Sequence, residues 1–155
     1  MTSEYDWQSG EGLTRIDDPA EVDAAFARGA DHLGTAVIGL AFHCPLAEVS
    51  PRILRAMRLP DPAQRGFAFT AAGTAARLNG ALTPELYAAL RAEGHGGVAQ
   101  NAIDDVLTFV PFRSLPRWFK WRWLVATVRD KLEGWWLRSA DVLGDARDAV
   151  RRRRS

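Results

Sequence analysis

Residues 61–112 constrain the fold of this chain more than any other stretch. They form three apolar-periodic segments of helical length, and glycine or proline separates each segment from the next. In the first segment, small or apolar side chains recur at steps of three and four, at Ala63, Phe67, Ala71, Thr74 and Leu78. This spacing places them on one face of a helix, and that face must be covered by another element.

The next two segments carry the start and stop signals of helices. Thr83 supplies an N-cap oxygen, and Pro84 follows it in the first turn, where a missing N–H costs nothing. The third segment has Ile103 and Val106 on its apolar side and stops at Pro111. No such helix can hide its apolar face alone, so the three must pack on one another. We therefore expect a shared core that includes Phe67, Ala71, Leu78, Ile103 and Val106.

The preceding residues continue the helical pattern. Asp18-Pro19 opens a helix that ends at Gly29, and two further apolar stripes cover residues 32–44 and 46–59. No segment alternates in steps of two for long enough to predict a strand. Helix starts near residues 31, 61 and 96 are about 30 and 35 residues apart, the period of paired-helix repeats. The expected fold is therefore all-α, a short stack of antiparallel helix pairs.

The start of the first segment, Asp61-Pro62 with Arg65 behind it, and the sequence from DPAQRGFAFTAAGTAARLNG to NAIDDVLTF resemble a group of short bacterial HEAT-repeat proteins. The resemblance extends over about Asp31 to Phe109, and the third unit departs from it with Gly96 and Gly97 where an Asp-Pro turn is expected. It implies a HEAT-like surface for a protein partner and no catalytic apparatus, because such folds present grooves instead of reactive side chains.

Charge divides the chain into unlike parts. Residues 1–112 carry 8 Lys or Arg against 14 Asp or Glu, whereas residues 113–155 carry 12 against 5. We expect a polar N-terminal arm over residues 1–17, a HEAT-like body over 18–112, and a basic C-terminal helix with an arginine tail over 113–155. Either the arm is disordered or it is pinned to the body through Tyr5 or Trp7.

The C-terminal part holds five of the six tryptophans. Trp121, Val125, Val128 and Leu132 follow a heptad-like seam, which predicts that they pack on the last helix pair as a cap. Tryptophans off this seam are expected to be partly exposed beside arginines, as an aromatic and basic contact patch. The candidate partner-binding residues are Trp123, Trp136, Arg122, Arg129 and Arg138.

The sequence contains few groups of side chains that could form a catalytic or metal site. Cys44 is the single cysteine, so no intramolecular disulfide forms, and we expect it to be a small apolar core residue without a catalytic role. His43, Cys44 and His95 lack the spacing of a metal site. We expect no enzyme, no cofactor and no metal. With an acidic body and no recognition-helix pattern, nucleic-acid binding is not expected either.

The expected function is a non-catalytic protein-binding module or small adaptor, with an immunity-type protein that neutralises a partner toxin as its narrower form. The alternative is binding to a membrane or other anionic surface through the aromatic, basic C-terminal helix. The first twenty residues lack a secretory pattern and no long apolar run exists, which favours the cytoplasm.

Overall fold

The computed structural model describes residues 5–129 and 131, and these residues form helices and turns without any strand. The helices are α1 (Pro19–Arg28), α2 (Leu33–His43), α3 (Leu46–Ala56), α4 (Pro62–Asn79), α5 (Pro84–Glu93) and α6 (Gln100–Phe109), with short 3-10 helices at Leu13–Arg15 and Phe112–Ser114. Residues 117–129 are also helical. The all-α prediction is confirmed. The chain divides into two compact units, Met1–Pro116 and Arg117–Ser155.

Local capping chemistry explains where α1, α4 and α5 begin. The Asp18 carboxylate accepts from the Ala20 N–H at 2.8 Å, and the Asp61 carboxylate accepts from the Ala63 N–H at 2.7 Å. Thr83 accepts from the N–H of the third residue that follows it, at 3.4 Å. A proline occupies the first turn in all three helices. These caps satisfy backbone donors that the helix leaves unpaired, so the start signals in the sequence are confirmed.

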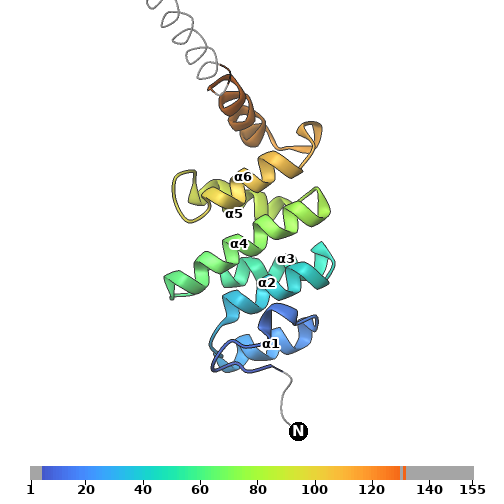
Figure 1. Ribbon diagram of the computed structural model, residues 1–155, viewed down its shortest axis with the longest axis vertical. Coiled ribbons are helices and arrows are strands. Elements are labelled where there is room, and N and C mark those ends of the chain that lie inside the picture. Colours follow the sequence, from blue (N-terminus) through green and yellow to red (C-terminus); the bar gives the residue numbers. More distant parts are fainter. Residues whose placement is uncertain (1–4, 130, 132–155) are drawn as a thin grey trace, which may run out of the picture. The chain divides into compact units, whose positions relative to one another are not determined.

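Within the first unit, α2, α4 and α6 lie side by side in one layer (Figure 1), and α4 packs against both neighbours. The starts of α2 and α4 are adjacent, because a Cβ added at Gly34 would lie 2.1 Å from the Gln64 carbonyl oxygen. The ends of α4 and α6 are adjacent too, since a Cβ at Gly80 would lie 3.9 Å from the Phe109 carbonyl oxygen. Helix α3 packs on α2 and α4, and α5 contacts α3.

The expected core is correct on α6 and wrong for two positions of α4. Ala71, Ile103 and Val106 are fully buried, whereas Phe67 is 41% exposed and Leu78 is 55% exposed. Small side chains fill most of the buried face of α4, which consists of Ala68, Phe69, Ala71, Ala72, Gly73, Thr74, Ala75 and Ala76. Small residues allow the backbones of neighbouring helices to approach closely, so the larger Phe67 and Leu78 remain outside the contact.

Residues 5–17 pack onto the helices. Of the two alternatives for the N-terminal arm, disorder or attachment to the body, these residues show attachment. Leu13 and Ile16 are fully buried. The Trp7 indole N–H donates to the Glu21 carboxylate at 3.0 Å, and the Arg28 guanidinium lies 5.2 Å from the centre of the Trp7 ring. An N-terminal segment of this kind is ordered only where such contacts hold it down.

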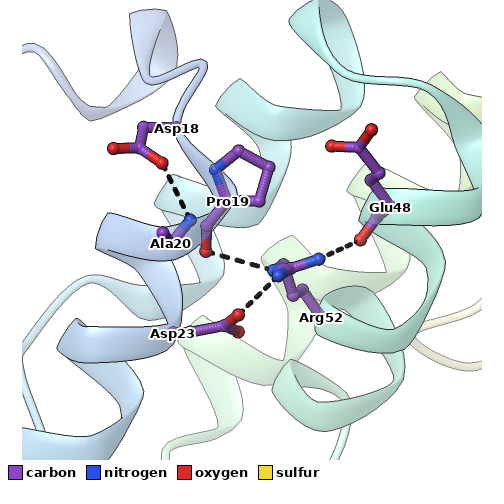
Figure 2. Close-up of polar contacts among 6 residues, drawn as sticks. All are labelled: Asp18, Pro19, Ala20, Asp23, Glu48 and Arg52. Carbon is purple, nitrogen blue, oxygen red and sulfur yellow. Dashed lines mark hydrogen bonds and ion pairs between the residues drawn. The ribbon is translucent and has the colours of Figure 1, made fainter.

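One arginine joins α1 to α3. The Arg52 guanidinium donates to the Pro19 carbonyl at 3.2 Å, to the Glu48 carbonyl and to the Asp23 carboxylate (Figure 2). The Arg52 side chain is mostly buried, whereas the Asp23 side chain is about half exposed. We call this set of contacts the Arg52 clamp. It fixes the separation of α1 and α3 near the start of α1, where Asp18 caps the helix.

We expect Arg52→Met to lower the free energy of unfolding by about 1–2 kcal/mol, because it removes three hydrogen bonds while the methionine keeps most of the packing. The figure is at the low end for charged hydrogen bonds, since water screens the half-exposed Asp23. Urea unfolding followed by circular dichroism measures the change. Arg91→Met is the control, because Arg91 is exposed and has no ion pair within the described part of the chain. Equal stability of both variants would contradict a clamp.

Candidate functional site

The structure describes three of the five candidate partner-binding residues, all in the helix over residues 117–129. Arg129 is exposed, whereas Arg122 and Trp123 are half-buried. The Arg122 guanidinium lies 5.8 Å from the centre of the Trp118 ring. Trp136 and Arg138 lie outside the described residues.

The seam expected to be buried in this helix is exposed instead. Trp121, Val125 and Val128 are 67%, 45% and 54% exposed, whereas Phe119 is buried. Leu132 lies outside the described residues. At about 100° per residue, Phe119 and Trp123 share the face opposite this seam. Both faces of the helix are apolar, so periodicity alone could not show which one turns inward.

An open groove of about 610 Å³ lies between α1, the start of α2 and α3 in the first unit. We call it the α1–α3 groove. Apolar groups form most of its wall, and two arginines complete it: Phe26, Gly29, Leu33, Pro51, Leu54, Arg55, Arg58 and Leu59. Concave apolar sites with a few polar groups are the usual form of binding sites in proteins.

The two arginines place positive charge at the groove. The Arg55 guanidinium lies over the Phe26 ring, 4.4 Å from its centre, which holds the cation against the apolar wall. Arg55 and Arg58 are both exposed. Neither forms an ion pair with any residue that the structure describes, so both charges remain available to a ligand.

The spacing of the arginines in and just after α3 places two of them at this groove. Arg52 and Arg55 are three residues apart, and Arg58 follows after another three, just beyond the helix end. Arg52 is used in the clamp near the start of α1, whereas Arg55 and Arg58 lie where α1 ends at Gly29. Gly29 has a φ of 66°, and a Cβ there would meet no atom within 4 Å, so the end of α1 leaves open space.

Sequence reasoning missed this groove. The signal was an arginine at every third position, Arg52, Arg55 and Arg58, interleaved with Pro51 and Leu54. This pattern places cations along an apolar surface of α3 and of the turn that follows it. Whether they enclose a hollow depends on α1 and α2, which the pattern of α3 does not include. Pro51 lies inside α3, which begins at Leu46.

Another apolar surface involves the ends of α4 and α6. Leu78 and Phe109 are exposed there, and the Arg77 guanidinium lies 5.3 Å from the centre of the Phe109 ring. Arg77 also pairs with the Asp105 carboxylate at 3.1 Å. The cation of this surface is therefore already neutralised within the chain, in contrast to the cations of the α1–α3 groove.

Cys44 is half-buried instead of a core residue, and its sulfur lies 3.3 Å from the Asp17 carbonyl oxygen. Burial, followed by the nearby Glu48 and Asp17 carboxylates, raises the pKa of the Cys44 thiol above its ordinary value. The thiolate is the reactive form of cysteine, so this environment makes Cys44 a poor nucleophile at neutral pH.

The histidines have separate surroundings. The His95 ring nitrogen lies 2.7 Å from the Gln100 side-chain nitrogen and 3.8 Å from the Asp104 carboxylate. The His32 ring contacts the Gln8 carbonyl at 3.1 Å. In the described ranges, no three or more His, Cys, Asp or Glu side chains are grouped so that they could hold a metal ion.

Comparison with known proteins supplies no relative: no protein-family model, no curated protein and no solved structure matches this chain. None of the helices in residues 5–129 combines the length and apolar character needed to cross a membrane.

Proposed function

We propose that this chain is a non-catalytic protein-binding module, a small adaptor, and that its α1–α3 groove receives an acidic segment of a partner protein with an apolar side chain as its anchor. The observation that carries the proposal is the groove itself, an apolar hollow beside two arginines that pair with no acidic side chain among residues 5–129. The parallel layer of α2, α4 and α6 supports a HEAT-like array, a class of fold that commonly presents binding grooves.

The lining of the groove defines the partner. An aliphatic or aromatic side chain that enters this open groove would be partly removed from water, which contributes less than the roughly 1.5–3 kcal/mol of full burial for a residue the size of leucine or phenylalanine. Arg55 and Arg58 can each donate paired hydrogen bonds to a carboxylate, a geometry that arginine favours. A segment with acidic residues on either side of an apolar one therefore matches both the shape and the charge of the groove.

The clamp prepares the groove for binding. Arg52 holds α1 to α3 through the Pro19 carbonyl group and the Asp23 carboxylate, so the walls are already in place before a ligand arrives (Figure 2). Binding then costs little reorganisation of the chain, and more of the contact energy appears as affinity. In this proposal the protein acts in the cytoplasm, and the immunity-type role stays a prediction.

The test uses two labelled peptides of equal length, one with aspartate around a central leucine and one with lysine in place of aspartate. We expect fluorescence anisotropy to show micromolar binding of the acidic peptide, weakened by salt, and no binding of the basic peptide. The double variant Arg55→Glu with Arg58→Glu should lose at least tenfold in affinity, because each substitution replaces an attractive charge by a repulsive one.

The matched control is Arg15→Glu with Arg91→Glu, which changes the net charge by the same amount at two exposed positions outside the groove. It should retain the affinity of the parent. Equal losses in both double variants would mean that only net charge matters, and the groove proposal would be wrong. Affinity capture from the host with the same variants then identifies the natural partner, whose recovery must depend on Arg55 and Arg58.

A further inference from the structure

We propose that the helix over residues 117–129 lies on an anionic lipid surface through one exposed apolar face. This face consists of Trp121, Leu124, Val125 and Val128, and we call it the apolar stripe. It is independent of the α1–α3 groove and belongs to the second compact unit.

The four side chains of the stripe follow a helical repeat. They occupy positions i, i+3, i+4 and i+7, which share one face over two turns. All four are substantially exposed, with Trp121 the most exposed of them. Large apolar side chains gathered in this way on a helix surface mark a contact with another apolar phase.

Cations border the stripe on both sides. With about 100° per residue, Lys120 lies beside one edge, Arg122 and Arg129 lie beside the other, and Arg117 lies at the start of the stripe. Residues 117–129 carry these four cations and no Asp or Glu. Long cationic side chains at both edges can reach the headgroups while the apolar side chains between them enter the boundary of the acyl region.

This charge pattern favours lipid over a protein groove as the occupant. Protein partners are usually selected by a mixture of attractive and repulsive charges, whereas residues 117–129 carry charges of one sign only. Tryptophan is enriched at the level of lipid headgroups, and Trp121 has the exposed position that such contact requires. Four cations are spread along residues 117–129, which favours a helix that lies in the plane of the surface over one that crosses the hydrocarbon core.

The experiment is flotation of the full chain with vesicles of phosphatidylcholine alone or with 30% phosphatidylserine, as about a third of anionic lipid gives a strong surface potential. We expect flotation only with the anionic vesicles, and less of it at high salt. Trp121→Ser with Val125→Ser should reduce the bound fraction at least tenfold. The control Ala126→Ser, at an exposed position off the stripe, should float like the parent.

Two further measurements separate this proposal from its rivals. Because the stripe is exposed, the double variant should unfold at the same urea concentration as the parent, so a loss of flotation reports the surface and not the fold. The groove variant Arg55→Glu with Arg58→Glu should float normally, which keeps the two proposals distinguishable. The lipid proposal is overturned if the parent does not float, if the stripe variant floats equally well, or if sedimentation shows that the stripe holds two copies of the chain together.

Discussion

Replacement of Gly34 by alanine is expected to lower the free energy of unfolding by about 2 kcal/mol or more. A Cβ at this position would lie 2.1 Å from the Gln64 carbonyl oxygen and 2.8 Å from its carbon. Both atoms belong to the backbone of α4, so no side-chain rotation can relieve the clash, and α2 must move away from α4. Overpacking of this kind typically costs 1–3 kcal/mol or more, which exceeds the gain of roughly 1 kcal/mol that alanine brings to a helix.

The movement would also weaken a specific contact. The Gly34 N–H donates to the Gln64 side-chain oxygen at 2.8 Å, in a part-buried position at the start of both helices. Separation of α2 from α4 lengthens this hydrogen bond and opens the largest helix interface in the first unit. Urea unfolding followed by circular dichroism provides the measurement.

Gly66→Ala is the matched control for this prediction. Gly66 lies inside α4, and the nearest atom to an added Cβ there is a methyl carbon of Val98 at 3.4 Å. Alanine fits at this distance, so the variant should be more stable than the parent by about 0.5–1 kcal/mol through helix propensity. If Gly34→Ala were as stable as Gly66→Ala, the close approach of α2 and α4 would be wrong.

Replacement of Ile103 by aspartate should unfold the protein or leave it aggregated. Ile103 is fully buried on α6, on the side of the helix that carries Ala102 and Val106. A carboxylate there has no partner, and both the burial of a polar group and the lost apolar contacts destabilise the fold by several kcal/mol. A domain of this size has only about 5–15 kcal/mol of stability in total.

Asn101→Asp adds the same charge to the same helix at an exposed position. It lies in the first turn of α6, where a negative charge interacts favourably with the helix dipole. We expect its stability to remain within about 0.5 kcal/mol of the parent. Thermal melting of both variants tests the burial of Ile103: a cooperative transition near the parent temperature in Ile103→Asp would show that α6 turns another face to the core.

The starts of α1, α4 and α5 could be predicted from the sequence because they depend on interactions within a few residues, whereas the start expected near residue 96 was wrong, since α6 begins at Gln100 without a side-chain cap. Asp18, Asp61 and Thr83 each cap the helix that follows, and Gly29 and Gly80 have the left-handed conformation that ends α1 and α4. The apolar repeat of α6 also identified Ile103 and Val106 as core. In these cases the local preference and the tertiary packing agree.

The choice of face required the tertiary structure. In α4, alanines and glycine fill the contact with two neighbouring helices, so Phe67 and Leu78 remain exposed although their spacing is that of a core. In the helix over residues 117–129 both sides are apolar, and the apolar period alone does not indicate which side is buried.

The α1–α3 groove shows the same division. The residues that line it were visible in the sequence, yet Phe26, Leu33 and Leu54 come from three helices whose separation is set by long-range contacts. One such contact joins Arg52 to Asp23 across 29 positions of the chain. The groove is a space that side-chain packing leaves unfilled. Short-range propensities determine the helices that form its walls, whereas the space itself depends on how these helices pack against one another.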